Sequence, residues 1–293
     1  MFSTKDLLYG HVVDCKGIGM KPQRIEMPAE GKNILQFQNH YKQLQIPYII
    51  YADFECLNIP VEGPACNPKE SNTRLIANQV PHHFCYCVVR RDGVSAKSVL
   101  FRGENAVNIF IESLRDELKT IKENLSNIAS IVMTPDDVNA FRMANDCHIC
   151  GGGLGDDRVR DHCHITGKYR GATHNACNLK LRIYPDKIKV PVVFHNLRGY
   201  DSHLIMQTLG GCEEISCIPN NMERYMTFNV GQLQFIDSLQ FQFLNSSLDK
   251  LSGNLRPDGL QITRVHSGGK NLELLRRKGV YPYEYINKRC VSL

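Results

Sequence analysis

The sequence predicts an α/β protein in which a small metal-binding insertion interrupts a mixed sheet flanked by helices. Three observations lead to this prediction. Apolar runs over 46–57 and 189–197 indicate two buried strands, each with acidic or amide residues at its end. Residues 147–178, between these runs, concentrate cysteine, histidine and glycine, which is typical of a compact metal site. Helical and strand patterns alternate on both sides of this stretch.

The other elements follow from hydrophobic spacing and from residues that start helices. Apolar residues recur at intervals of three and four from Ile111 to Ile128, which predicts a helix whose apolar stripe packs on the core. Thr134 followed by Pro135 marks the start of a second helix. In chain order we further expect a hairpin over 82–103, a helix over 201–209, a strand over 233–243 and a helix over 246–255.

The composition is that of a soluble globular protein, with 42% hydrophobic residues, 22% charged residues and a net charge of +5. No apolar run is long enough to span a membrane, and the N-terminus lacks the apolar region of a secretory signal. We therefore expect an intracellular protein whose twelve cysteines are reduced thiols or metal ligands. Residues 256–293 are basic, which suits either contact with DNA or a solvated surface.

Cys85 and Cys87 lie at alternate positions of the predicted hairpin. Both thiols therefore project from the same side of a strand. Zinc binding and burial as small apolar side chains both remain open, and we favour burial.

Two pairs of metal-ligand residues define the insertion. They are Cys147 with Cys150 and His174 with Cys177. Two donors separated by two residues project from one tight turn, and two such pairs complete the tetrahedron of a structural Zn²⁺ site. The glycine-rich stretch between the pairs has little apolar surface to bury, so we expect its folding to depend on the metal. Cys163 and His164 are the alternative ligands if the pairing differs.

A second group of polar residues lies around the zinc ligands. Asp161 and His162 stand between the two pairs, and Asn178 follows the last ligand. A neutral histidine beside a carboxylate accepts a proton from water, while carboxylate and amide oxygens are ligands suited to Mg²⁺. Arg160 and Arg170 are candidates to hold phosphate groups.

This segment resembles the HNH nucleases, and its stretches DHCHITGKYRG and CN resemble the recombination endonuclease VII family in particular. The resemblance implies that Asp161, His162 and Asn178 are catalytic. His174 stands where that family usually has cysteine, and histidine remains a competent zinc ligand. The alternative is a zinc-stabilised insertion that contacts DNA without cutting it.

Acidic residues at the ends of the two buried strands form another candidate site. Asp53 and Glu55 in YADFEC are two residues apart, so both carboxylates project from one side of the strand. The stretch FHNLRGYD places Asn196, Tyr200 and Asp201 directly after the next strand. An Asp-x-Glu pair alone is common at protein surfaces. The pair is informative here because the stretch FHNLRGYD follows the next strand.

Together these segments resemble the first and second exonuclease motifs of family B DNA polymerases, whose 3′→5′ exonuclease domain has a ribonuclease H-like fold. The resemblance implies that Asp53, Glu55 and Asp201 hold two Mg²⁺ or Mn²⁺ ions around a scissile phosphate. It also implies that Asn196 and Tyr200 contact the DNA end, with the tyrosine ring available for stacking.

Two further stretches extend the resemblance to about residues 40–286. FIDSLQFQFLNSSLDKL resembles the Ser-Leu motif of protein-primed polymerases, which implies that Ser238 and Leu239 help to hold single-stranded DNA. RRKGVYPYEY, over 276–285, resembles the linker of Polinton-type polymerases, which commonly carry an endonuclease VII-like insertion between the first two exonuclease motifs. The implied partners are DNA and a terminal-protein primer, and the implied location is the nucleus.

The predicted domains are an N-terminal extension over 1–45 with a zinc-finger remnant at His11 and Cys15, an exonuclease-like domain over 46–133 and 186–255, a zinc insertion over 134–185 and a basic linker over 256–293. No Tyr-x3-Asp segment or Asp-Thr-Asp motif follows, so a fourth exonuclease carboxylate and nucleotide polymerisation are not expected. We expect a truncated polymerase with little or no exonuclease turnover. The alternatives are a stand-alone HNH endonuclease and a non-catalytic, zinc-stabilised DNA-binding module.

Overall fold

The computed structural model describes residues 4–15, 27–33, 44–61, 76–93, 96–209, 215–221, 224–241, 246–277, 279, 281–282 and 284. The chain forms two units, Met1–His40 and Tyr41–Leu293. The described part of the first unit contains one helix, α1 (Lys5–Cys15), which spans the predicted zinc-finger remnant. All the predicted site residues belong to the second unit.

The described part of the second unit contains a seven-stranded mixed sheet in the order β3-β2-β1-β6-β9-β8-β7. Its strands are β1 (Tyr48–Pro60), β2 (Ala77–Arg90), β3 (Ala96–Arg102), β6 (Val190–Phe194), β7 (Ile215–Pro219), β8 (Tyr225–Val230) and β9 (Leu233–Asp237). β6 pairs in parallel with both β1 and β9, whereas the outer strands pair antiparallel. The predicted α/β architecture with a mixed sheet is confirmed.

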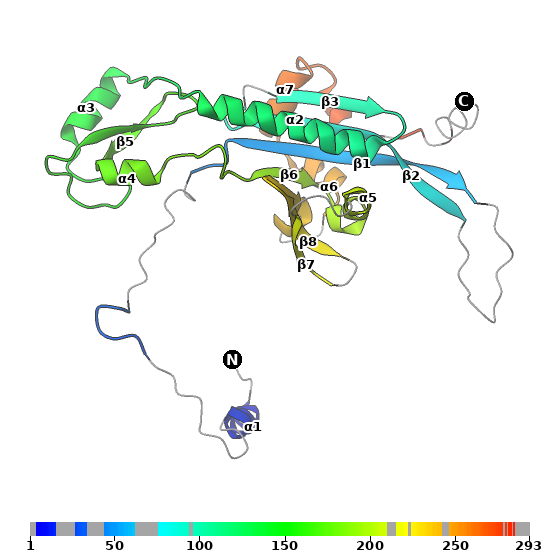
Figure 1. The fold of residues 1–293 in the computed structure, drawn as a ribbon, viewed down its shortest axis with the longest axis horizontal. Helices are drawn as coiled ribbons and strands as arrows, with labels where there is room; N and C mark the ends of the chain where they lie inside the picture. Colours follow the sequence, from blue (N-terminus) through cyan, green and yellow to red (C-terminus); the bar gives the residue numbers. More distant parts are fainter. Residues whose placement is uncertain are drawn as a thin grey trace. The chain divides into compact units, whose positions relative to one another are not determined.

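Helices flank this sheet. They are α2 (Ala106–Ser126), α5 (Asp201–Thr208), α6 (Leu248–Asn254), α7 (Gln261–His266) and α8 (Leu272–Leu275), with short 3₁₀ helices η2 (Leu197–Gly199), η3 (Ser238–Phe241) and η4 (Pro257–Gly259). Figure 1 shows α2, the predicted amphipathic helix, lying along β1, β2 and β3. Within the described residues, no helix combines the length and apolar character needed to cross a membrane.

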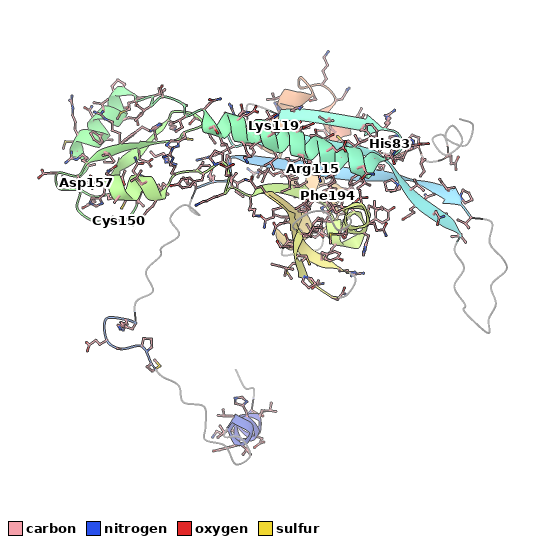
Figure 2. All side chains as sticks on the ribbon, viewed as in Figure 1. His83, Arg115, Lys119, Cys150, Asp157 and Phe194 are labelled. Atoms are coloured by element: carbon pink, nitrogen blue, oxygen red, sulfur yellow. The ribbon has the colours of Figure 1, made fainter. Side chains whose placement is uncertain are left out.

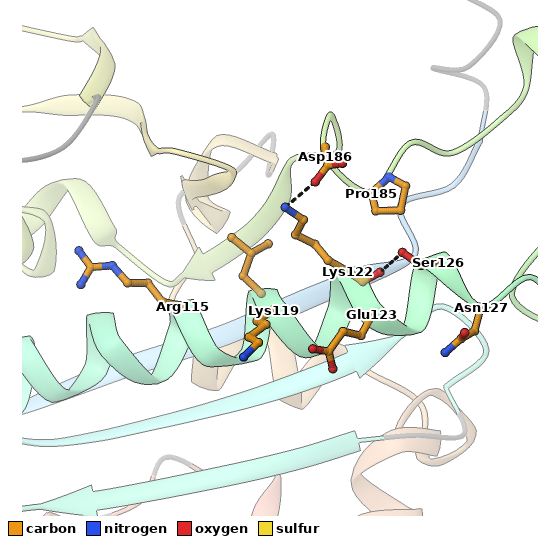
Figure 3. Close-up of a pocket in the computed structure, with 9 residues that line it drawn as sticks. Arg115, Lys119, Lys122, Glu123, Ser126, Asn127, Pro185 and Asp186 are labelled. Carbon is orange, nitrogen blue, oxygen red and sulfur yellow. Dashed lines mark hydrogen bonds and ion pairs between the residues drawn. The ribbon is translucent and has the colours of Figure 1, made fainter.

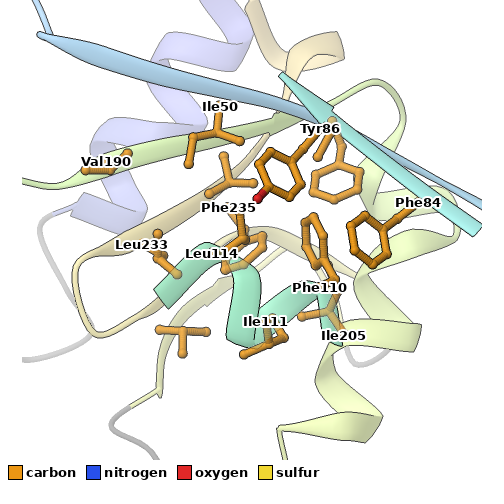
Figure 4. Close-up of a cluster of buried hydrophobic side chains, with 14 of the residues drawn as sticks. Ile50, Phe84, Tyr86, Phe110, Ile111, Leu114, Val190, Ile205, Leu233 and Phe235 are labelled. Atoms are coloured by element: carbon orange, nitrogen blue, oxygen red, sulfur yellow. The ribbon is translucent and has the colours of Figure 1, made fainter. Parts of the chain in front are cut away.

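The apolar core lies between α2 and one face of the sheet (Figure 4). β1 buries Ile50 and Phe54 on this face. The α2 residue Phe110 packs edge-on against Phe54 and Phe84, with ring centroids 4.8 and 5.2 Å apart. Because side chains alternate along a strand, the neighbours of these β1 residues project to the opposite face.

The insertion has its own small sheet and core. Its elements are α3 (Pro135–Met143), β4 (Val159–His162), β5 (Tyr169–Thr173) and α4 (Asn175–Lys180). Thr134 caps α3 as predicted, because its hydroxyl accepts the Asp137 N–H and the Asp137 carboxylate accepts the Thr134 N–H. Near the tip of the β4–β5 hairpin, Ile165 packs against the main core. Gly167 is required there, since a Cβ atom would lie 2.3 Å from the carbonyl oxygen of Ser130.

Some elements differ from the sequence prediction. The strand expected over 233–243 ends at Asp237, because the Asp237 carboxylate accepts the N–H of Leu239 at 3.0 Å and the chain turns into η3. The β7–β8 hairpin was not predicted, since β7 is largely exposed and lacks a buried alternation. The burial expected for Cys85 and Cys87 is wrong: Cys85 is exposed and Cys87 half-buried, because they project from the face of β2 opposite α2.

We expect Leu114→Ala to lower the free energy of unfolding by about 2–5 kcal/mol, because Leu114 is 0% exposed and its removal leaves a cavity under α2. Urea unfolding of the zinc-loaded protein measures this change. The control is Leu100→Ala on β3, where the leucine is 63% exposed and the expected change is under about 0.5 kcal/mol. Similar effects for the two variants would contradict the assigned core.

Candidate metal sites

The four predicted zinc ligands lie together in the insertion. One donor atom from each of Cys147, Cys150, His174 and Cys177 lies within 4.8 Å of all the others. No other group of three or more Cys, His, Asp or Glu side chains in the described part of the chain gathers in this way. The first pair stands before β4, and the second pair stands at the N-terminal end of α4. Three sulfur donors and one imidazole match the preference of a structural zinc ion.

Neighbouring groups orient these donors. The Nε2 atom of His174 lies 2.9 Å from the carbonyl oxygen of Gly153, which only accepts, so Nε2 carries the proton. Nδ1 then faces Cys150 and Cys177, with sulfur atoms at 3.5 and 3.8 Å. Burial acts to raise the pKa of the Cys147 thiol, but hydrogen bonds from Thr173 and from backbone N–H groups lower it to about 5. The thiolate form that binds zinc is therefore favoured at this position.

Asp161 is paired with two basic side chains inside the insertion. Its side chain is 0% exposed, and its oxygens lie 2.5 Å from Arg170 Nη2 and 3.0 Å from His148 Nε2. Burial acts to raise the pKa of Asp161, yet the hydrogen bonds from His148 and Arg170 outweigh it and lower the pKa. The predicted roles of Asp161 as a Mg²⁺ ligand and of Arg170 as a phosphate contact stay predictions, and in this structure the two side chains pair with each other inside the insertion.

His148 was missed as a partner of Asp161. Its sequence signal was its place inside the first ligand pair, between Cys147 and Cys150. The ring packs over Gly171, where a Cβ atom would lie 2.7 Å from two ring carbons. Glycine at this position of β5 therefore lets the histidine reach across the hairpin to Asp161.

The remaining HNH-type residues differ in accessibility. His162 is half-buried, and its Nε2 lies 3.2 Å from the carbonyl oxygen of Ala129. Arg160 is exposed, with its guanidinium carbon 4.8 Å from the centroid of the Phe141 ring. Asn178 is half-buried on α4.

The alternative zinc ligands Cys163 and His164 do not belong to the metal group. Cys163 lies after β4, with its N–H donated to the Lys168 carbonyl in the hairpin turn. The His164 ring instead packs against His162, with centroids 5.1 Å apart.

The acidic residues of the main sheet form the second candidate site. Asp53 and Glu55 project from the side of β1 opposite the core, as their spacing predicted, while Phe54 between them is buried. Asp201, the first residue of α5, is also buried at 5% exposure. Unlike the zinc ligands, these three side chains do not form a group gathered closely enough to hold a metal ion in this structure.

The three carboxylates are nevertheless close enough to repel one another. Burial, followed by repulsion from Asp53 and then from Glu55 and Asp237, raises the pKa of Asp201 to about 7. Loss of hydration, followed by repulsion from Glu55, raises the pKa of Asp53 to about 6. The surrounding protein removes part of the hydration of the Asp53 carboxylate, yet this side chain keeps substantial accessible area. Solvent and ions can therefore still reach it. A cation at this place would relieve the repulsion.

The turn after β6 carries the predicted DNA contacts. Asn196 is exposed and adopts the left-handed conformation, with φ 71°. Tyr200 is half-buried beside Cys56; burial raises the pKa of the Cys56 thiol, and the neighbouring Tyr200 acts to lower it. Ser238 and Leu239 are also half-buried, and the Ser238 hydroxyl lies 2.9 Å from Nδ1 of His195 in the turn. The structure thus brings the second and third motif segments together.

Asp237 is a further acid near Asp201 that sequence reasoning did not single out. It is 0% exposed and accepts backbone N–H groups from Asn196 and Arg198. Its signal in the sequence was its place immediately before the predicted Ser-Leu motif.

An open groove of about 720 Å³ lies elsewhere, along α2 (Figure 3). Lys122 and Asp186 form an ion pair of 2.6 Å in its wall, and its lining includes none of the predicted site residues. The zinc group is also separate from the sheet: Figure 2 shows Cys150 at the insertion end, away from Phe194 and His83.

Comparison of the chain with protein-family models, with curated proteins and with solved structures finds no match. Within the described residues, fold and site therefore define an α/β protein with a mixed seven-stranded sheet and a group of cysteine and histidine side chains able to bind a metal such as zinc.

We expect the purified chain to bind about one Zn²⁺ ion and Cys177→Ser to lose most of it, because a closed site needs all four ligands. Atomic absorption after removal of loosely bound metal measures the zinc content. Cys163→Ser is the matched control, since it removes a buried thiol outside the metal group and should retain zinc. Equal loss in the two variants would reject the assigned ligand set.

We expect Asp201→Asn to stabilise the fold at pH 8 by roughly 1–3 kcal/mol and to change it little at pH 4. The folded-state pKa of Asp201, about 7, lies above the ordinary 3.8, so the folded chain holds this proton more tightly. The associated stability is complete below about pH 4 and is lost as the pH rises through 7. An amide cannot ionise and therefore avoids the loss.

Urea unfolding of the zinc-loaded protein at both pH values, without added divalent cations, measures this difference. The exposed Asp186→Asn serves as the control and should change stability little at either pH. A stabilisation by Asp201→Asn that is equal at pH 4 and pH 8 would show that carboxylate repulsion is not its cause.

Proposed function

We propose that the chain binds DNA ends at a divalent-cation site of the exonuclease type, as the exonuclease region of a protein-primed family B DNA polymerase does. The observation that carries the proposal is the mutual repulsion of Asp53, Glu55 and Asp201, which come from segments almost 150 residues apart. Destabilising clusters of like charges are typical of sites that bind cations or act on substrates. Two cations held by such carboxylates would orient a phosphodiester and stabilise its leaving oxygen.

The fold supports this proposal. The mixed sheet with parallel strands β1, β6 and β9 and with α2 on one face agrees with a ribonuclease H-like arrangement. Asp53 and Glu55 lie on the sheet face opposite α2, away from the core residues of β1. Tyr281 packs against His83, the β2 partner of Glu55, so the part of this face that a nucleic acid strand can reach lies around the exposed Asp53.

The surroundings of the carboxylates suit a single strand. Asn196 offers an exposed amide, and Tyr200 and Leu239 offer half-buried apolar surface for base contacts. A terminal-protein primer as partner and a nuclear location belong to the same proposal, and both rest on the resemblance alone.

The insertion fits a structural, DNA-contacting module better than a nuclease. Its zinc group is closed by four protein donors, and the carboxylate of Asp161 is occupied by Arg170 and His148. Arg160 remains exposed and can contact a phosphate. Plasmid nicking that is abolished by His162→Ala would instead favour the HNH endonuclease alternative.

We expect Mg²⁺ to tighten binding of a labelled single-stranded oligonucleotide by at least about fivefold in the wild type. Asp201→Asn should bind more tightly than wild type without Mg²⁺, because one repulsive charge is gone, and should respond weakly to the ion. Fluorescence anisotropy of the full zinc-loaded chain measures both constants, and little trimming of the 3′ end is expected. Asp186→Asn, which removes a remote charge, should behave as wild type; the proposal fails if Asp201→Asn keeps the full Mg²⁺ response.

A further inference from the structure

Asp237 joins two segments that meet at one edge of the carboxylate site. It is the last residue of β9 and pairs in register with Phe194, the last residue of β6. Its Oδ1 atom accepts the N–H groups of Asn196 and Leu239, both at 3.0 Å. Its Oδ2 atom accepts the N–H of Arg198 at 3.2 Å and lies 3.7 Å from the Nε atom of the same arginine. One buried carboxylate thus fixes the chain after both strands.

The turn after β6 needs such an external partner. Asn196 holds a left-handed backbone, with φ 71°, which costs free energy for a residue other than glycine. The Asn196 amide also fills the space beside Gly199, where a Cβ atom would lie 2.6 Å away. A conformation of this kind persists only when surrounding contacts determine it.

This turn places Asp201. Residues 197–199 form η2, the Tyr200 N–H returns to the Leu197 carbonyl at 3.4 Å, and Asp201 then begins α5. Asp53 and Glu55 repel Asp201. Without a fixed turn, this repulsion would drive the start of α5 away from β1.

We propose that Asp237 is a positioning residue that holds Asp201 beside Asp53 and Glu55 through the turn from Asn196 to Gly199, without binding the cation itself. The consequence for cation binding rests on the proposed function. The role in positioning rests on the backbone contacts alone. A direct role as a further cation ligand conflicts with the 0% exposure of Asp237 and with the three N–H groups that occupy its oxygens.

Asp237→Asn tests the proposal, because the amide keeps the shape but places an NH₂ group against backbone N–H donors. The matched control is Glu117→Gln, another buried carboxyl, on α2 at the opposite face, which receives the Tyr86 hydroxyl at 3.0 Å. Electron paramagnetic resonance with Mn²⁺ as the probe measures cation affinity in the full zinc-loaded chain. Circular dichroism and zinc content report whether each variant is folded.

We expect Asp237→Asn to weaken Mn²⁺ binding by about tenfold or more while Glu117→Gln leaves it unchanged. Equal effects of the two variants, or no effect of Asp237→Asn, would overturn the role of Asp237 in cation binding. If the wild type binds no Mn²⁺ at this site, the proposed function fails and positioning is decided by the following measurement.

The second measurement is the coupling between Asp53→Asn and Asp201→Asn, obtained from urea unfolding at pH 8 as a double-mutant cycle. In the wild type we expect a clear coupling, because each variant relieves the same repulsion. In the Asp237→Asn background we expect the coupling to be lost, since the two carboxylates are no longer held together. A coupling of the same size in both backgrounds would overturn the proposal whether or not Mn²⁺ binds.

Discussion

Successive residues of strand β1 face opposite sides of the sheet: one set faces the apolar core, and the other set faces the side that carries the acidic residues. Ile50 and Phe54 belong to the apolar core with α2, and their burial stabilises the fold. Asp53 and Glu55 project to the opposite side, where loss of hydration and mutual repulsion destabilise the ionised form of Asp53. The acidic site can exist only because the other face of the same strand is so thoroughly buried. Because side chains alternate along β1, the same strand contributes both to the stability of the core and to the candidate cation site.

The described chain contains two kinds of interior. The sheet and α2 exclude water with aromatic and aliphatic side chains, such as Phe84 and Phe110. The insertion has only a small apolar cluster, and its four donor side chains take the place of a larger core. Metal removal should therefore affect the insertion first, because zinc binding contributes free energy that its few apolar contacts do not supply.

The buried carboxylates Asp161, Asp237 and Asp201 differ in the groups that surround them. Asp161 is compensated by Arg170 and His148, and Asp237 is compensated chiefly by backbone N–H groups. Asp201 lies among other acids, and its pKa is raised. The first two carboxylates are occupied by hydrogen-bond donors, whereas the repulsion on the third is one that a cation would relieve. A buried carboxylate whose charge is compensated by neighbouring donors is a structural residue, whereas one whose charge is not compensated is a candidate cation ligand.

The sequence by itself determined what depends on neighbours along the chain: the α2 stripe, the Thr134 cap, the outward projection of Asp53 and the paired zinc donors. These patterns are set by the fixed periods of helix and strand and by short turns. Tertiary structure alone decided that Asp161 meets His148 and that Asp237 ends a strand and fixes a distant turn. Such contacts join segments 13 and 41 residues apart, and their partners are chosen by folding in space, which no local period encodes.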